Sequence, residues 1–270
     1  MYLPANYLDM QDQVVWITGA SSGIGEALAQ AFAKRGAKVI LSSRRQEALE
    51  SVKANSSFGD RMEVVPLDMT KGEDIQQRAQ EVIQRFGQVD ILVNNAGISQ
   101  RSLVKDTPID IDRRVMEVDF FGTVALTKAV LPSMLSRKKG RILVVTSLTG
   151  KFGTPLRSAY AAAKHALHGF FDSLRAEVHD DGLRVMLICP GFIKTDVSVN
   201  AITGDGTKHA KMDDKQAGGM EPSELAERII RAMQRGKEEA YFGGYEILGV
   251  YLKRFFPRIF SRYIRQAKVT

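Results

Sequence analysis

A tyrosine and a lysine four residues apart, with a serine upstream of them, have the types and spacing best suited to catalysis: Tyr160, Lys164 and Ser147. Residues four apart share one face of a helix, so the phenol and the ammonium can point into one site. A neighbouring ammonium favours a phenolate and brings the pKa of a tyrosine, ordinarily about 10, toward working pH, which suits a general acid/base. Ser147 ends an apolar run, and open α/β sheets bind ligands where their strands end.

The composition of the chain that must position these residues is that of one globular domain. It has 270 residues, 44% of them hydrophobic, which is enough for one sizeable core. The single cysteine, Cys189, lies in an apolar run, so we expect no disulfide and a reducing, cytoplasmic compartment. Residues 1–13 lack the apolar core of a signal peptide, and no run of about 18 apolar residues predicts a spanning helix.

Short β-branched runs alternate with helical patterns along most of the chain. The predicted strands are apolar on both faces, which is typical of a parallel sheet covered by helices. We therefore expect an α/β fold in one domain, a Rossmann-type doubly wound parallel sheet flanked by helices. The expected strands are 14–18, 38–41, 62–66, 90–94, 141–147 and 183–189, and the expected helices are 24–35, 46–53, 72–86, 109–136, 158–179 and 223–235.

Two segments depart from this rhythm. Residues 192–220 show no period, and we interpret them as a substrate loop because long loops in compact domains are commonly functional. A basic tail follows the domain, so we divide the chain into residues 1–244 and 245–270.

A glycine-rich segment, Thr18-Gly19-Ala20-Ser21-Ser22-Gly23-Ile24-Gly25, follows the first expected strand and opens the first expected helix. Such glycines permit a tight turn and let the backbone approach a pyrophosphate at the positive end of a helix. Residues 41–45, after the second strand, hold no carboxylate for a ribose 2′-hydroxyl. Arg44 can instead fork onto a 2′-phosphate while Ser43 donates a hydrogen bond, which favours NADP over NAD. The alternative is that both arginines only begin the next helix, as we expect of Arg45.

With these motifs in one order, residues 12–240 resemble the short-chain dehydrogenase/reductase family. Residues 157–165 and 190–195 are similar to its dehydrogenase/reductase member 7 branch. The resemblance implies hydride transfer between NADP(H) and a ketone, aldehyde or secondary alcohol. The matching residues are Thr18 to Gly25, Leu67, Asp68, Asn94 to Gly97, Ser147, Tyr160, Lys164, Pro190, Gly191 and Thr195.

The resemblance also implies a role for each matching residue. Tyr160 would exchange a proton with the substrate oxygen, Ser147 would hold that oxygen, and Lys164 would also bond the nicotinamide ribose. The other residues expected at the cofactor come from the glycine turn and from the ends of several strands. They are Gly19, Ser21, Ser22, Gly23, Ile24, Gly25, Ser43, Arg44, Asp68, Met69, Asn95, Ala96, Gly97, Pro190, Ile193 and Thr195.

One position departs from the family pattern. The family carries an asparagine in a Val-Asn-x-x-Gly context, and this chain has Asp119 there. The asparagine is thought to hold a water that relays protons to the lysine, chiefly through its backbone carbonyl. Asp119 keeps that carbonyl and adds a negative charge that Lys164 can balance, so we expect it to belong to the catalytic group and the relay to survive.

The expected rim of the substrate site is apolar. Phe152, Pro155, Leu156 and Phe192 favour a hydrophobic carbonyl or alcohol as the small-molecule partner. The alternative is that these residues only pack against the cofactor and neighbouring helices. We expect no metal site, because two histidines three apart, at 165 and 168, lack a third ligand.

The tail is strongly basic for its length. Residues 245–270 carry six cations against Glu246, a balance of +5, so the rest of the chain carries about +2 of the total of +7. Aromatic side chains interleave with the cations, and a helix around Pro257 would be amphipathic, which is typical of binding at a membrane surface. Packing on a partner subunit or on the domain is the alternative. Nucleic acid would need a wider basic surface, so we expect none as a partner.

Two broader questions stay open at this stage. In the family, helices corresponding to 109–136 and 158–179 pair across subunits, so we expect a homodimer or homotetramer. A non-catalytic NADP(H)-binding sensor and a membrane-surface protein are the alternatives to an enzyme. The intact set of Ser147, Tyr160 and Lys164 favours the enzyme, because a sensor has no need of a tuned phenol.

Overall fold

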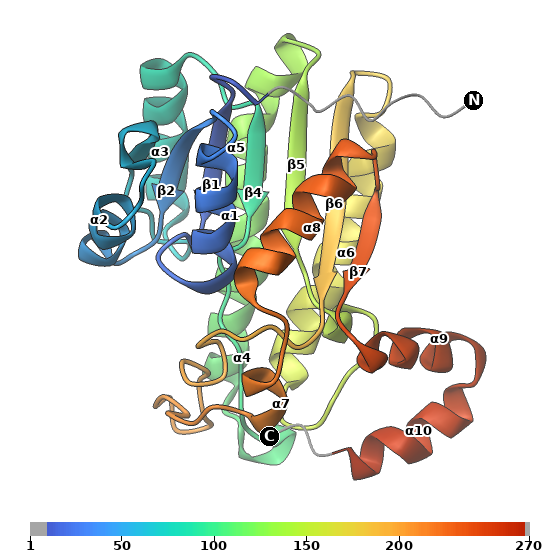
Figure 1. Ribbon diagram of the computed structural model, residues 1–270. Coiled ribbons are helices and arrows are strands. Elements are labelled where there is room, and N and C mark those ends of the chain that lie inside the picture. The colour runs from blue at the N-terminus through green and yellow to red at the C-terminus, as the bar shows by residue number, and fades with distance from the viewer. Residues whose placement is uncertain (1–9, 268–270) are drawn as a thin grey trace.

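A single parallel sheet forms the centre of the molecule in the computed structural model, which describes residues 10–267 (Figure 1). Within that range seven strands follow the order β3-β2-β1-β4-β5-β6-β7, all neighbours being parallel, so the expected doubly wound fold is confirmed. The order reverses between β1 and β4, where folds of this kind bind ligands. The strands are β1 Val14–Thr18, β2 Lys38–Ser42, β3 Met62–Val64, β4 Ile91–Asn94, β5 Gly140–Val145, β6 Leu183–Pro190 and β7 Glu239–Phe242.

Helices cover both faces of the sheet because its strands are apolar on both sides. Val15 and Ile17 of β1 join a core with α1 Gly23–Ala33, α2 Gln46–Ala54 and α8 Pro222–Gln234. Val14 and Trp16 face the opposite way. They belong to a second core with α3 Gly72–Phe86, α5 Gly122–Ser136 and α6 Ser158–Glu177.

The expected helix 109–136 is interrupted in the structure. It consists of α4 Ile109–Met116, a π-helical turn η3 Glu117–Phe121, and α5. By length and composition this stretch is the one described helix apolar enough to cross a membrane. It packs against α3 and α6 and gives Val118, Leu126 and Val130 to the second core, so it serves here as a core helix.

The substrate loop holds more structure than its sequence predicts. Its backbone forms two isolated bridges, one to the body between Gln100 and Ile202 and one within the loop between Ile193 and Met220. The short helix α7 Asp214–Ala217 lies within it. Neither α7 nor β7 was expected; β7 is short and only partly buried, so it lacks the apolar run that marks the other strands.

The tail folds back as a helical hairpin at the end of the molecule where the strands finish (Figure 1). After the turn η5 Tyr245–Ile247 come α9 Leu248–Phe255 and α10 Pro257–Gln266, which contact each other. Pro257 is the first residue of α10, where its missing N–H costs nothing. Residues 1–9, to which most of the signal-peptide expectation applies, and 268–270 lie outside the described residues.

Candidate active site

One cavity of about 1070 Å³ runs along the carboxyl ends of the strands, from the glycine turn to the C-terminal hairpin. It brings together the residues expected from sequence at the cofactor and the substrate except Gly25, Asp119, Pro155 and Leu156. Ser147, Tyr160 and Lys164 therefore lie on the same cavity as the glycine turn. The opposite end of the cavity is lined by aromatic side chains of the hairpin.

The glycine turn depends on left-handed backbone and on close packing. Gly19 has φ +65° and Gly23 has φ +60°, a region that favours glycine. The side-chain amide of Asn95 donates to the carbonyl oxygens of Thr18 and Gly19 at 3.0 and 3.1 Å. A Cβ on Gly25 would lie 2.6 Å from the same amide nitrogen, so Gly25 serves this packing from outside the cavity.

Two arginines flank the cavity beyond β2. Arg45 caps the amino end of α2, as expected, and its guanidinium also donates to Ser21 Oγ at 3.4 Å. The Ser43 hydroxyl accepts from the backbone N–H of Arg45 at 3.3 Å, and Ser43, Arg44 and Arg45 all line the cavity. Sequence reasoning missed Arg45 as a cavity residue, although the Arg-Arg pair was the available signal.

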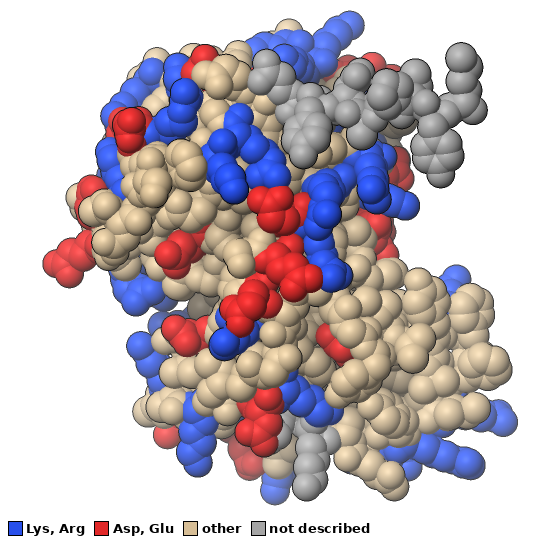
Figure 2. Space-filling model, in the orientation of Figure 1, with Lys and Arg blue, Asp and Glu red and all other residues tan. Residues whose placement is uncertain are grey.

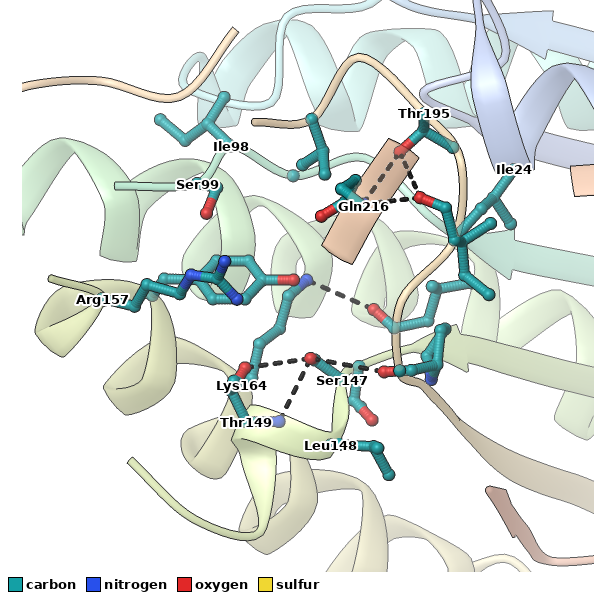
Figure 3. Close-up of a pocket in the computed structure, with 18 of the residues that line it drawn as sticks. Ile24, Ile98, Ser99, Ser147, Leu148, Thr149, Arg157, Lys164, Thr195 and Gln216 are labelled. Atoms are coloured by element: carbon teal, nitrogen blue, oxygen red, sulfur yellow. Dashed lines mark hydrogen bonds between the residues drawn. The ribbon is translucent and has the colours of Figure 1, made fainter. Parts of the chain in front are cut away.

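The cavity wall between these ends comes from the loops that follow β3 and β4, from the end of β6 and from the loop after it. Asp68, Met69, Ala96 and Gly97 line its middle, and Pro190, which ends β6, lines it together with Ile193 and Thr195. The amide of Gln216, on α7, donates to the Ile193 carbonyl at 2.6 Å (Figure 3). Sequence reasoning missed Gln216, whose hydrogen bond joins α7 to the start of the substrate loop, where Ile193 lines this wall.

Ser147 lies just beyond the end of β5. The strand ends at Val145, so the expected strand end was wrong by two residues, and Ser147 precedes the turn η4 Leu148–Gly150. Its Oγ accepts from Thr149 N at 3.1 Å and from Thr149 Oγ1 at 2.9 Å (Figure 3). Two donors thus occupy the acceptor sites of the hydroxyl, leaving its own hydrogen to donate. Its donor contact here, to the Pro190 carbonyl, is long at 3.5 Å.

Tyr160 and Lys164 are one turn apart on α6, as their spacing predicts. The Lys164 Nζ lies 5.4 Å from the centroid of the Tyr160 ring and donates to the Val145 carbonyl at 3.2 Å. Lys164 is buried, whereas Tyr160 is half-buried and reaches the cavity. A positive charge is thus held beside the phenol on the side away from solvent.

Asp119 lies behind Lys164 and forms an ion pair with it, Oδ2 to Nζ at 3.2 Å. The π-helical turn carries Asp119, whose Oδ1 accepts from the N–H of Ile98 at 2.7 Å. Burial raises the pKa of Asp119, while Lys164 and the Ile98 N–H act against that shift. Burial alone would lower the pKa of Lys164, but the negative charge of Asp119 raises it above its usual value. A Cβ on Gly97 would lie 2.9 Å from Asp119 Oδ2, so glycine leaves room for the pair.

The substrate loop is fastened to the body by buried charges. Asp213, just before α7, bonds Arg101 at 2.6 Å and Arg157 at 2.9 Å. Burial and the charge of Arg101 lower the pKa of Arg157 to about 10, against the opposing charge of Asp213. Both arginines line the cavity, and sequence reasoning missed all three residues because their contact joins distant segments.

The expected apolar rim is partly present. Phe152 and Phe192 line the cavity, but Pro155 and Leu156 are absent from its described lining. Phe152 is buried beneath the hairpin, with its ring centroid 5.2 Å from that of Phe260 in α10. This wall therefore depends on the tail as well as on the domain.

A buried polar cluster lies behind η4, and it contains His168 of the histidine pair but not His165. His168, Cys189 and Glu239 come close enough to suggest metal ligands. Glu239, however, already bonds Lys151 at 2.7 Å, so a cation fills that place. Burial raises the pKa of Cys189 to about 12, which keeps the thiol protonated. This donor set fits a hydrogen-bonded network that joins β6, β7 and α6, and not a metal site.

Comparisons of sequence and structure show which proteins this chain is similar to. A family profile described as short chain dehydrogenase matches residues 13–205. Dehydrogenase/reductase SDR family member 7B of Rattus norvegicus is 44% identical, covering 94% of this chain and 80% of its own length. A short-chain dehydrogenase from Streptomyces avermitilis is 31% identical with a TM-score of 0.82, covering 95% of this chain and 98% of its own. An alcohol dehydrogenase from the archaeon Thermococcus sibiricus, complexed with 5-hydroxy-NADP, is 28% identical with a TM-score of 0.74, covering 87% of this chain and 97% of its own.

Proposed function

This chain belongs to the short-chain dehydrogenase/reductase family, in its dehydrogenase/reductase member 7 branch, and on that premise we propose that it is an NADP-dependent oxidoreductase acting on a hydrophobic ketone, aldehyde or secondary alcohol. The observation that carries the proposal is that Ser147, Tyr160 and Lys164 line the cavity that begins at the glycine turn. When bound, NADP(H) supplies the acceptor or donor of hydride.

The preference for the 2′-phosphorylated cofactor is supported by charge. Arg44 and Arg45 line the cavity where β2 ends, and no carboxylate lies between residues 41 and 45. Two guanidinium groups suit a phosphate and leave a free 2′-hydroxyl without an acceptor. The relative from Thermococcus sibiricus, described in complex with 5-hydroxy-NADP, is consistent with this choice. The glycine turn fits a pyrophosphate, since its backbone is open to the cavity at the amino end of α1.

The proton chemistry belongs to the chain's own residues. In the reducing direction the Tyr160 hydroxyl gives its proton to the substrate oxygen while Lys164 stabilises the negative charge left on the phenol. Thr149 occupies the acceptor sites of Ser147, so the Ser147 hydroxyl donates a hydrogen bond to the same substrate oxygen. In the oxidising direction the Tyr160 phenolate accepts the hydroxyl proton of the alcohol. Asp119 keeps Lys164 charged, and a water-mediated proton supply to Lys164 stays part of the proposal.

The cellular setting of the enzyme is also a proposal. We expect a cytoplasmic homodimer or homotetramer that pairs through η3, α5 and α6, with no nucleic-acid partner. An exposed aromatic side chain on that face supports pairing: Phe121 is 52% exposed and contacts Phe120, which contacts Phe170 of α6. Size-exclusion chromatography with light scattering would test it, with Phe121→Ser weakening the assembly.

The test of cofactor and reaction is a panel of apolar ketones and aldehydes offered with NADPH or NADH. We expect NADPH to give a kcat/KM at least tenfold higher, since each charge-assisted contact to phosphate contributes about 1.5–3 kcal/mol. Arg44→Ala should raise the KM for NADPH and leave the KM for NADH unchanged. Lys53→Ala, a cation of α2 outside the cavity, is the matched control. Faster turnover with NADH would contradict the choice of NADP.

A further inference from the structure

The C-terminal hairpin, defined here as residues 245–267, concentrates exposed apolar side chains. Among the described residues, seven of the twelve large apolar side chains that are exposed belong to this short segment. Phe255 is 68% exposed and Phe256 58%. A patch of this kind on a folded domain marks an interaction site. The seven are Tyr245, Leu248, Tyr251, Phe255, Phe256, Ile259 and Tyr263.

The same hairpin carries exposed positive charges without carboxylate partners. None of its five described cations forms an ion pair within the described chain; they are Lys253, Arg254, Arg258, Arg262 and Arg265. Its one acidic residue, Glu246, is used elsewhere, since its carboxylate accepts from Phe192 N at 3.1 Å. In Figure 2 blue atoms edge a broad tan area at the lower right, where Figure 1 places α9 and α10. The surface is therefore both apolar and cationic.

The two kinds of side chain are ordered along α10. Phe260 points inward and packs on Phe152, whereas Ile259 and Tyr263, four apart, are exposed. Arg258 and Arg262, also four apart, form an exposed row beside them. A helix with aromatic and aliphatic residues next to a row of arginines is suited to lie parallel to a membrane, at the boundary between lipid headgroups and acyl chains.

We propose that the C-terminal hairpin binds the surface of a bilayer that contains anionic lipids. Cations suit anionic headgroups, at about 1 kcal/mol for each cation near the surface, and the exposed rings enter the acyl boundary. A second copy of the chain complements this surface poorly, because the chain outside residues 245–270 has a net charge of about +2 and offers no acidic excess. The exposed apolar area has no counterpart in the polar surface of a nucleic acid.

The cavity connects this surface to the catalytic residues. Leu252, Phe256, Phe260 and Tyr263 of the hairpin line the same cavity as Tyr160. This step rests on the proposed function: a membrane-dissolved ketone or alcohol enters between the hairpin and the domain and reaches Ser147 and Tyr160 without crossing water. Phe256 and Tyr263 are both exposed and on the cavity, so the surface proposed for the bilayer is continuous with the entrance for an apolar substrate.

The docking test compares vesicle co-sedimentation of the full chain on pure phosphatidylcholine and on phosphatidylcholine with about 30% phosphatidylglycerol. The test variant is Arg258→Glu with Arg262→Glu, two residues outside the cavity lining. The matched control is Arg235→Glu with Lys237→Glu, two exposed residues in the turn that joins α8 to β7, which changes the net charge equally. We expect binding to the anionic vesicles, at least a tenfold lower partition coefficient for the test variant, and no change for the control. Ile259→Ser should weaken binding severalfold.

Two outcomes would overturn the proposal. Absence of wild type from the anionic-vesicle pellet, or equal pelleting of the test and control variants, contradicts docking through the hairpin. Loss of a dimer in the test variant, without vesicle binding by wild type, would assign the hairpin to a subunit interface instead.

Sedimentation needs no turnover, so its result is independent of the proposed function. The substrate route is tested by turnover rates on cyclohexanone in water and on a long-chain ketone in vesicles. The test variant should turn over the long-chain ketone at least tenfold more slowly than wild type and cyclohexanone at the same rate. If the test variant matches wild type on both ketones, the route is excluded.

Discussion

At the scale of single residues, Lys164 is held between the Asp119 carboxylate and the Tyr160 ring. Asp119 lies 3.2 Å behind it, and the Tyr160 ring centroid lies 5.4 Å in front. The ion pair keeps the lysine charged in a buried place where burial alone would favour the neutral amine. The replacement of the family asparagine by aspartate therefore changes the electrostatics of the site while leaving its geometry suited to catalysis.

Asp119→Asn tests that charge. Without the carboxylate the pKa of Lys164 falls, so its ammonium is lost at a lower pH. We expect the alkaline limb of the kcat/KM profile to move to lower pH, with little change near neutral pH. The measurement is kcat/KM between about pH 6 and pH 10, with Asp110→Asn, exposed at the start of α4, as the matched control. A change below about threefold at every pH would show that the charge has no role.

The residue types at the site were predictable, but their partners were not. Spacing on one helix predicted Tyr160 and Lys164, because helical periodicity is local. The direct pairing of Asp119 with Lys164 depends on a π-helical turn that no sequence period marks. Thr149, which orients the Ser147 hydroxyl, was missed because its role follows from a turn beyond the strand.

At the scale of elements, the substrate loop is held by one carboxylate between two arginines. The loop sequence predicted a long irregular segment, whereas Asp213 with Arg101 and Arg157 ties it to the body. Such pairing joins residues more than fifty positions apart, so it lies beyond reasoning from local pattern. The arginines lie on the cavity, so the position of the loop controls the shape of the substrate end.

Asp213→Ala tests the loop attachment. Removing one partner of a buried ion pair costs about 3–5 kcal/mol, because the Arg101 guanidinium keeps its burial without its carboxylate. We expect faster proteolysis within the loop and a KM for substrate raised at least fivefold, with a smaller change in kcat. Asp214→Ala, exposed on the same loop, outside the cavity lining and with no described ion pair, is the control. Equal proteolysis of the two variants would contradict the role of Asp213.

Strand β7 is fastened at its start by Glu239. Burial opposes ionisation of this carboxyl, but hydrogen bonds from His168, Lys151 and Tyr241 lower the pKa of Glu239 to about 2. Because the folded pKa lies below the unfolded value of 4.5, the stabilisation is complete above about pH 4.5 and is lost as pH falls toward 2. The sequence did not predict β7, since this strand has only four residues, begins with a charged one, is mostly half-buried and pairs only with distant β6.

Glu239→Gln should therefore lower the free energy of unfolding most at neutral pH. We expect the difference from wild type to shrink as the pH is lowered below about 4.5, because wild type then loses the same charge. Urea unfolding followed at several pH values between about 3 and 7 measures it. The control is Glu238→Gln, because Glu238 directly precedes Glu239 and its side chain is exposed. A difference that grows on acidification would contradict the assignment.

At the scale of the whole molecule, one cavity joins three parts of the chain that sequence analysis treated separately. The sheet supplies the glycine turn and Ser147, the substrate loop covers the middle, and the hairpin closes the far end. The fold class followed from apolar runs on both faces, which are a property of each strand alone. The place of the hairpin could not be predicted, because it depends on packing of Phe260 on Phe152 across more than one hundred residues. The tail was predicted to be amphipathic, and its exposed apolar side chains are continuous with the cavity, as Phe256 and Tyr263 show.

The central claim is that Tyr160 exchanges the proton while hydride moves to or from NADP(H), and Tyr160→Phe tests it most directly. The variant removes only the hydroxyl, so the ring keeps its packing beside Lys164. Single-turnover rates with NADPH and an apolar ketone, together with NADPH affinity measured by fluorescence, separate chemistry from binding. We predict a rate lower by about 10²–10⁴-fold with NADPH affinity within about threefold of wild type. Unchanged turnover in Tyr160→Phe would contradict the account.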